Sequence, residues 1–395
     1  MKYPSAMKWT RVRINLTYLA AVMIAVSITG QNQHTHATTF TKIALAGEPA
    51  PGTTASFGPS AFEFFSTAVQ LNDAGQVSFH ATLDQTVLGL PPEGIWGGTP
   101  GNLQPVAIND DPVLGSPEGI AINLSSLDHP IPLSENGQVA FTAFVKGGPG
   151  TGFSSIWRST PGNIENIAMT NTQAPGAQTG QTFDWFVRTT PNNINGSGDV
   201  AFRATITNPD GSTSTDQGIW IAHETDATPV VITGQQIPGR PVGFTFAGAI
   251  LQGLNNNDQV IFNAVDPARS TNTQGLWIGT DYNNLRPIIG SAGASVPVIK
   301  PDGTPSKTYI PPQAFYGAQL NNAGQVAFAA RDDNDKAGLW IDDNGAVTAV
   351  AIEGSPAPGA PSGSLFNAFD PDIADFSGVE NPGYAFNDAG DVAFI

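Results

Sequence analysis

The sequence contains no cysteine and few basic residues. Without Cys among its 395 residues, the chain can form neither disulfides nor thiolate metal sites, and it has no cysteine nucleophile. Lys and Arg total 16 against 33 Asp and Glu, a formal net charge of −17. Binding to a phosphate backbone needs clustered Lys and Arg. Nucleic acid is therefore not expected as a partner, and anionic membrane surfaces are disfavoured for the same reason.

Histidine is also scarce, which limits the chemistry that the sequence predicts. Beyond the N-terminal region only His80, His129 and His223 occur, and none has metal-ligand spacing with another histidine. A histidine-based zinc site is therefore not expected. Residues 125–129 (SSLDH) contain all three residue types of a catalytic triad, but no Gly-x-Ser-x-Gly motif accompanies them. We interpret them as a polar loop.

The N-terminus has the layout of a secretory signal peptide. Four basic residues precede an apolar stretch from Leu16 to Ile28, and small and polar residues follow it. The apolar stretch is shorter than the roughly 20 residues that a membrane-spanning helix needs, which disfavours the alternative of an anchor. We therefore expect a signal peptide over residues 1–37 and a secreted or cell-surface location. No later segment is apolar for long enough to span a membrane.

What the chain does contain is a repeat. An Asn/Gly-type turn leads into an alternating apolar strand six times, with the turn position 60 to 66 residues from one copy to the next. Such a period indicates one supersecondary unit that must stack on its neighbours to bury its apolar faces. The six phrases are LNDAGQVSF, LSENGQVAF, INGSGDVAF, LNNNDQVIF, LNNAGQVAF and FNDAGDVAF.

Each repeat carries four extended segments, which we name a to d. Segment a is aromatic, segment b is the repeated phrase, segment c holds an Ile-Trp or Leu-Trp pair, and segment d ends in many copies at a Pro-Gly turn. The two large residues of segment c point to opposite faces of a strand, so both faces of each sheet should be covered. The sequence therefore predicts an all-β fold, a single β-propeller over residues 38–395 with six blades of about four strands.

The first segment of the repeat is out of phase with the last. Residues 42–45 read as a d segment, whereas the chain stops in a b segment at Ile395. We therefore expect the N-terminal strand to complete the blade that contains Val392 and Phe394 and so to close the ring. The last strand stops earlier than its siblings, so we expect the extreme C-terminus, or an anchor, to be missing.

The repeated phrase, the Trp strands and the Pro-Gly turns together resemble bacterial exported proteins built from NxxGxxAF tandem repeats, the choice-of-anchor surface proteins. The phrase is clearest at residues 72–79, 321–328 and 387–394. The resemblance implies an exported surface protein of uncharacterised role, and it brings no catalytic residue with it. Asp258, which stands where the other repeats have Gly, departs from the pattern.

One acidic loop is a candidate metal site. Asp332, Asp333 and Asp335 directly follow segment b of the fifth repeat, and carboxylates are ligands that calcium prefers. The loop lacks the spacing of a known calcium motif, and the sibling loops carry no such cluster, so a solvated turn is the competing interpretation. Apart from calcium, no cofactor is expected.

Three functions remain open from the sequence. We favour a non-enzymatic surface module that binds an unknown protein or glycan with the long b-to-c and d-to-a loops, which emerge at one end of the blades. The first alternative is an extracellular carbohydrate-active lyase or hydrolase with carboxylates over the central channel, since acid/base chemistry needs only two well-placed groups. The second is a structural matrix or adhesion protein.

Overall fold

A computed structural model describes most of the chain. It covers residues 21–25, 40–53, 58–66, 69–85, 92–110, 121–124, 131–146, 153–160, 163–187, 193–212, 214–224, 226–265, 274–289, 296–299, 305–309, 317–332, 334–367 and 384–394. In these ranges the regular structure is β-strand apart from one 3-10 turn, η2 (Tyr282–Asn284). The all-β prediction is confirmed.

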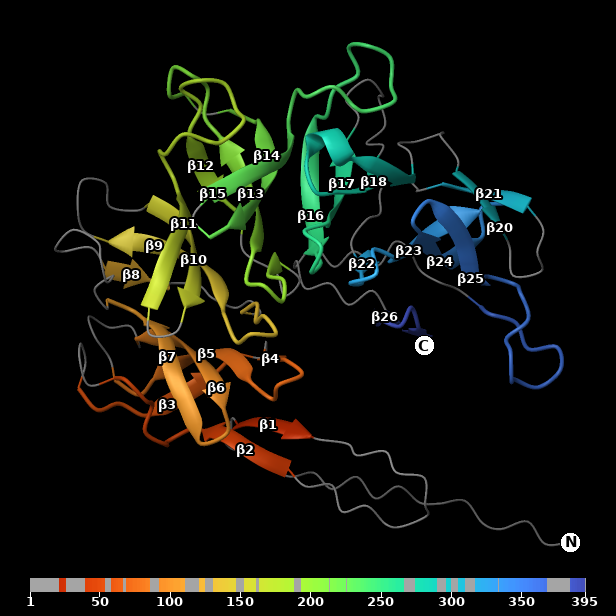
Figure 1. The fold of residues 1–395 in the computed structure, drawn as a ribbon. Helices are drawn as coiled ribbons and strands as arrows, with labels where there is room; N and C mark the ends of the chain where they lie inside the picture. Colours follow the sequence, from red (N-terminus) through yellow and green to blue (C-terminus); the bar gives the residue numbers. More distant parts are fainter. Residues whose placement is uncertain are drawn as a thin grey trace, which may run out of the picture.

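Successive repeats form successive sheets, which follow one another around an arc (Figure 1). The first sheet contains β3 (Phe62–Phe65), β4 (Gln70–Leu71), β5 (Val77–Leu83), β6 (Glu93–Thr99) and β7 (Asn102–Ile108). The second contains β8 (Ala121–Asn123), β9 (Ala140–Lys146), β10 (Phe153–Thr160) and β11 (Asn163–Met169). The third contains β12 (Phe183–Phe186), β13 (Val200–Ile206), β14 (Gln217–His223) and β15 (Asp226–Ile232).

The remaining repeats continue the series. The fourth sheet contains β16 (Gly248–Leu254), β17 (Val260–Val265), β18 (Gln274–Gly279) and β19 (Arg286–Ile289). The fifth contains β20 (Val296–Ile299), β21 (Pro305–Tyr309), β22 (Gln319–Leu320), β23 (Val326–Asp332), β24 (Ala337–Asp343) and β25 (Ala346–Ile352). A two-stranded sheet of β26 (Tyr384–Phe386) and β27 (Val392–Phe394) follows. Segments b, c and d of the first five repeats are thus neighbouring antiparallel strands, as in a β-propeller.

The same aromatic pair fixes the register of strands b and c in every complete sheet. The Phe of segment b lies directly opposite the Trp of segment c, and cross-strand aromatic pairs stabilise such ladders. In the third sheet the rings of Phe202 and Trp220 stack with centroids 5.9 Å apart. The five pairs are Phe79 with Trp96, Phe141 with Trp157, Phe202 with Trp220, Phe262 with Trp277 and Phe328 with Trp340.

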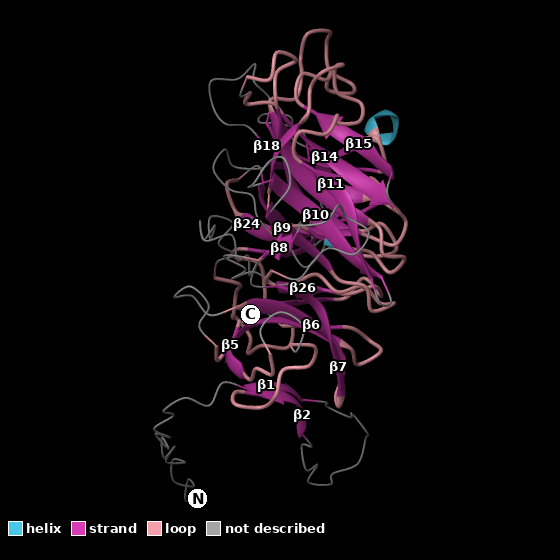
Figure 2. Cartoon of the chain, turned by 90° about the vertical axis from the view of Figure 1, so that its left-hand side faces the viewer, coloured by secondary structure: helices cyan, strands magenta, loops and turns pink. Residues whose placement is uncertain are grey.

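The apolar cores lie between consecutive sheets, and Figure 2 shows the strands of the first sheet below those of the second and third. In the third sheet Trp220 packs toward the second sheet and Ile219 toward the fourth, and both are fully buried. The indole nitrogen of Trp220 donates a hydrogen bond of 2.9 Å to the carbonyl of Pro175 in the preceding Pro-Gly turn. Trp96 donates in the same way to Pro51. The expectation that both faces of each sheet are covered is confirmed.

Six complete blades and ring closure are not confirmed. Strand β2 (Phe40–Leu45) pairs with β1 (Ala21–Ala25), whereas β27 pairs with β26, so the expected ladder between residues 42–45 and the last strand is absent from the described residues. Strand β2 and the turn after it still pack on the first sheet, because Ile43, Ala44 and Ala50 belong to the same buried core as Phe62 and Trp96. Most of the predicted signal peptide lies outside the described residues.

The described residues contain no helix that is long and apolar enough to cross a membrane.

Candidate functional site at the ring of turns

The turn before each b strand has the same geometry. The first residue of the turn, Asn or Ser134, accepts a hydrogen bond through its side-chain oxygen from the backbone N–H four residues later, as at Asn72 and Gln76 (2.9 Å). The residue at the glycine position has a positive φ, which glycine adopts without strain. This confirms the sequence interpretation of the turns. The φ values are 75° at Gly75, 84° at Gly137, 91° at Gly198, 57° at Asp258, 80° at Gly324 and 84° at Gly390.

Four of the five pairs of consecutive turns are hydrogen-bonded to one another in the same way, and only the third turn, where Gly196 has no side chain, lacks the bond to the turn before it. The second residue of a turn accepts, through its side chain, the backbone N–H of the second residue in the preceding turn. Asn322 accepts from Asn256 N (2.8 Å), and Asp388 accepts from Asn322 N (2.8 Å). Glu135 and Asn256 make the corresponding bonds to the turns before them. We call this arrangement the ring of turns.

The ring of turns borders a cavity of about 330 Å³. Residues of the second to sixth repeats line it, so it lies where the sheets converge. Its lining combines apolar side chains such as Leu133, Leu254 and Phe386 with the polar side chains of Glu135 and Asn256. The ring lies at the opposite end of the strands from the b-to-c loops, where we had expected a ligand.

A second regular contact joins neighbouring turns. The residue after the turn glycine points at the glycine of the next turn: a Cβ added to Gly137 would lie 2.6 Å from Gln76 Nε2, and one added to Gly324 would lie 2.8 Å from Gln259 Oε1. At the contact between the third and fourth repeats both positions differ. Asp199 replaces the glutamine and Asp258 replaces the glycine. Two carboxylates therefore meet where the other repeats bring an amide against a glycine.

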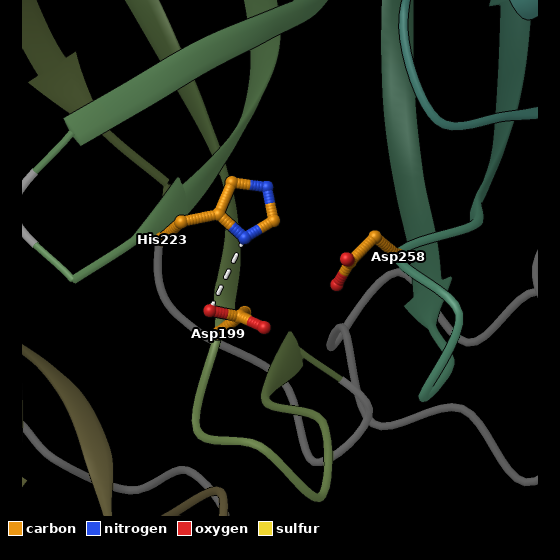
Figure 3. Close-up of side chains that lie close together, drawn as sticks. All are labelled: Asp199, His223 and Asp258. Carbon is orange, nitrogen blue, oxygen red and sulfur yellow. Dashed lines mark ion pairs between the residues drawn. The ribbon is translucent and has the colours of Figure 1, made fainter.

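His223 completes this cluster. It ends β14, and its Nδ1 lies 3.2 Å from Asp199 Oδ1. Figure 3 shows the three side chains converging from the third and fourth repeats. One ligand-type atom from each of Asp199, His223 and Asp258 lies within 4.8 Å of the other two. The cluster is partly open to solvent, since the His223 side chain is 43% exposed and that of Asp199 17%.

The electrostatics of the cluster are dominated by its two carboxylates. Burial, and then the negative charge of Asp199, raise the pKa of Asp258 above its ordinary value of 3.8. The Asn195 amide donates to Asp258 Oδ1 (2.9 Å) and to Asp199 Oδ2 (3.2 Å). Asn195 also lines the cavity, so it lies between the cavity and the carboxylate pair, whose own residues are not part of the lining. The cluster can exchange a proton or hold a cation.

The acidic loop that the sequence singled out lies elsewhere. Asp332 is buried, and its Oδ1 accepts the backbone N–H groups of Asn334 (2.9 Å) and Lys336 (3.0 Å). Asp335 N donates to the Asp332 carbonyl, as in a tight turn. Asp333 lies outside the described residues. Calcium binding by this loop stays a prediction.

Sequence reasoning missed Asp199 and His223. His223 was set aside because no other histidine lies at ligand spacing, and only Asp258 was noted as a departure from the repeat. A usable signal was present: residues 199 and 258 both break the pattern, in consecutive turns. The segment 125–129 and His129 lie outside the described residues.

Comparison with known proteins places the chain in a family. Residues 71–395 match the model of DUF7453, a family of unknown function, and the chain belongs to this family. No curated protein matches.

Solved structures similar to this chain include three glycosidases. An α-L-arabinanase of Penicillium chrysogenum with arabinobiose is 10% identical and matches over 78% of this chain and 85% of its own, with a TM-score of 0.30. A GH93 α-L-arabinofuranosidase of Fusarium graminearum with arabinobiose is 9% identical and matches over 72% of this chain and 80% of its own, with a TM-score of 0.29. A Trypanosoma rangeli sialidase mutant displaying trans-sialidase activity is 10% identical and matches over 84% of this chain and 53% of its own, with a TM-score of 0.35. The chain spans about half the length of the sialidase.

These comparisons correct our preferred function. A non-enzymatic binding or scaffold module was wrong as the main prediction, because the similar structures named above are all carbohydrate-active enzymes.

Proposed function

We propose that this chain is a carbohydrate-active enzyme, a hydrolase or a lyase, whose substrate binds in the cavity at the ring of turns. A volume of about 330 Å³ falls within the range of small-molecule sites, roughly 300–1,000 Å³. A sugar presents apolar C–H faces and hydroxyl edges. The lining offers both an aromatic ring, Phe386, and amide or carboxylate groups such as Asn256 and Glu135.

The carboxylate pair beside this cavity is the observation that carries the proposal. Asp199 and Asp258 come from different sheets, and Asn195 connects both of them to the cavity. Cleavage of a glycosidic bond by hydrolysis or elimination needs groups that can take and give a proton at the bond. Burial, and then the negative charge of Asp199, raise the pKa of Asp258, so this carboxyl holds a proton more readily than an isolated aspartate does.

Turnover on a panel of polysaccharides tests the proposal. The full chain is incubated with neutral and uronic polysaccharides, and new reducing ends and unsaturated products are measured. We expect activity on at least one substrate, with a loss of about 100-fold or more in the Asp199→Asn, Asp258→Asn double variant. Asp391→Asn, the same change in the sixth repeat, is the matched control and should retain activity. Absence of turnover on every substrate, or full activity of the double variant, would overturn the proposal.

The proposal includes an extracytoplasmic location and a six-bladed ring. The leader pattern over residues 1–37 supports export, and the resemblance to NxxGxxAF surface repeats supports a place at the cell surface. Six turns at near-constant spacing support six blades, with β26 and β27 as the inner strands of the sixth. N-terminal sequencing of the secreted protein tests the first part, since it should begin close to residue 38.

A further inference from the structure

We propose that Asp199, His223 and Asp258 bind a single divalent transition-metal ion of the Zn²⁺ or Mn²⁺ class between the third and fourth sheets. This inference goes beyond the proposed function and does not depend on it, because an ion could be held whether or not a carbohydrate is turned over.

The geometry suits a metal ion after a small movement. Nitrogen and oxygen ligands lie about 2.0–2.2 Å from a tetrahedral zinc ion, so two of its ligands are roughly 3.3–3.6 Å apart. His223 Nδ1 and Asp199 Oδ1 are already 3.2 Å apart. The complete set lies within 4.8 Å, so a movement of about 1 Å in the Asp258 side chain brings it within reach of a tetrahedral ion. The cluster supplies three protein ligands, and the exposed edge of His223 leaves room for water or substrate.

The internal repeats provide an independent argument. The residue three places after the Trp of segment c is Thr99, Thr160 and Thr280 in the first, second and fourth repeats and Asp343 in the fifth, and only the third repeat has a histidine. Asp258 likewise stands at a position that is glycine in every other turn. Asp199 shares its position with Asp391, whereas the other four repeats have glutamine. Three departures from the repeat thus coincide in one place, although they lie as far as 59 residues apart in the chain.

The surroundings favour a cation over two free carboxylates. Carboxylates that bind metals are themselves held by hydrogen bonds, and the Asn195 amide donates to both. Without a cation, two like charges lie close together in a chain of net charge −17. Asp258 also replaces glycine at a φ of 57°, where an aspartate is less favourable than glycine. A bound ion would offset both costs.

The ligand types select the class of metal. An imidazole with two carboxylates suits Zn²⁺ or Mn²⁺, whereas Ca²⁺ and Mg²⁺ prefer oxygen ligands alone. If the chain is also the proposed enzyme, the ion could activate a water beside the cavity, in place of a proton carried by the carboxylate pair.

Metal titration of the full chain tests the inference without any substrate. After treatment with chelator and its removal, Zn²⁺ and Mn²⁺ are titrated by calorimetry, and thermal unfolding is followed with each metal. We expect one equivalent of metal and a metal-dependent rise in Tm, because an ion that binds only the folded state stabilises it by mass action. Ca²⁺ should have a much smaller effect at this site.

The controls use residues from the sibling repeats. His223→Thr and Asp258→Gly restore the residues that other repeats carry, so both variants should fold. Each should weaken metal binding by about 100-fold or more. Loss of a residue that only hydrogen-bonds to a metal ligand weakens binding by roughly 10- to 100-fold, so a larger effect indicates loss of a ligand. Asp391→Gln, a sibling change outside the cluster, should bind as the wild type does. Failure of the wild type to bind one equivalent, or unchanged binding in both site variants, would overturn the inference. Metal binding without turnover would leave this inference standing and count against the proposed enzyme alone.

Discussion

The contact between neighbouring turns can be measured with two equivalent glycines. Gly75 and Gly198 occupy the same repeat position and both have a positive φ, 75° and 91°. A Cβ added to Gly75 meets nothing within 4 Å, whereas one added to Gly198 would lie 1.6 Å from Gln138 Oε1. Replacing each with alanine therefore separates the cost of the backbone conformation from the cost of the contact between turns.

The magnitudes follow from the two environments. An alanine in the left-handed region costs about 1–2 kcal/mol, and reduced freedom of the unfolded chain offsets about 0.4–1 kcal/mol of this. Gly75→Ala should therefore lower the free energy of unfolding by about 1 kcal/mol. Gly198→Ala must also displace Gln138, whose Oε1 accepts a hydrogen bond from Asn136 Nδ2 (3.0 Å). That loss adds about 1 kcal/mol, for a total of about 2 kcal/mol.

Urea unfolding followed by tryptophan fluorescence measures the difference. Trp220 is buried in the core between the second and third sheets, which this contact joins, and it reports the loss of that core. We expect the unfolding midpoint to fall about twice as far for Gly198→Ala as for Gly75→Ala, with an unchanged slope. Equal shifts for the two variants would show that Gln138 does not restrain the third turn, and the proposed contact between the second and third turns would have to be abandoned.

Three further changes have defined outcomes. Asp342 is fully buried and pairs with Arg286 at 2.6 Å, so Arg286→Met leaves it without its counter-charge. Thermal unfolding should show that the free energy of unfolding falls by about 3 kcal/mol, and the additional change Asp342→Leu should largely restore it. A loss of stability that persists in the double variant would contradict the pairing. The raised pKa of Asp258 means that the folded state binds this proton more tightly than the unfolded state does. The contribution of this proton to stability is complete below pH 3.8 and is lost as pH rises through the folded pKa. In the presence of chelator, Asp258→Asn should therefore gain stability relative to the wild type as pH rises, and parallel pH profiles of stability would refute the coupling. Deletion of residues 39–52 uncovers the first sheet, where Ile43 is buried, and should lower Tm by several degrees; an unchanged melting curve would show that this segment does not support the fold.

The sequence predicted the parts of the fold that are local. Alternation along segment b, the Ile-Trp pair of segment c and the Asn-x-x-Gly turns each depend on residues within one repeat, and the structure confirms all three. The prediction that the Trp side chains are core residues holds for the same reason: Trp220 has an apolar face on one sheet and a carbonyl acceptor, Pro175, within one repeat length.

Contacts between repeats were harder to predict. The cluster of Asp199, His223 and Asp258 forms because the residue after one turn points at the next turn, a relation that spacing along the chain does not express. Ring closure would require β2 to pair with β27 at the other end of the chain, whereas in the structure β2 pairs with β1, whose residues lie only 15 to 24 positions earlier. The functional prediction relied on the absence of sequence motifs, whereas the cluster of Asp199, His223 and Asp258 is assembled across two sheets.

The position of the apolar cores constrains how relatives of this chain can differ in length. Each core is shared by two consecutive sheets, with Trp220 facing backward and Ile219 facing forward, so an inserted or deleted segment preserves all interfaces only if it comprises whole repeats. Gene duplication within the family should therefore change the chain in steps of one unit, here 60 to 66 residues. Shorter insertions belong in the loops, and a fragment needs at least two consecutive repeats to contain one intact core.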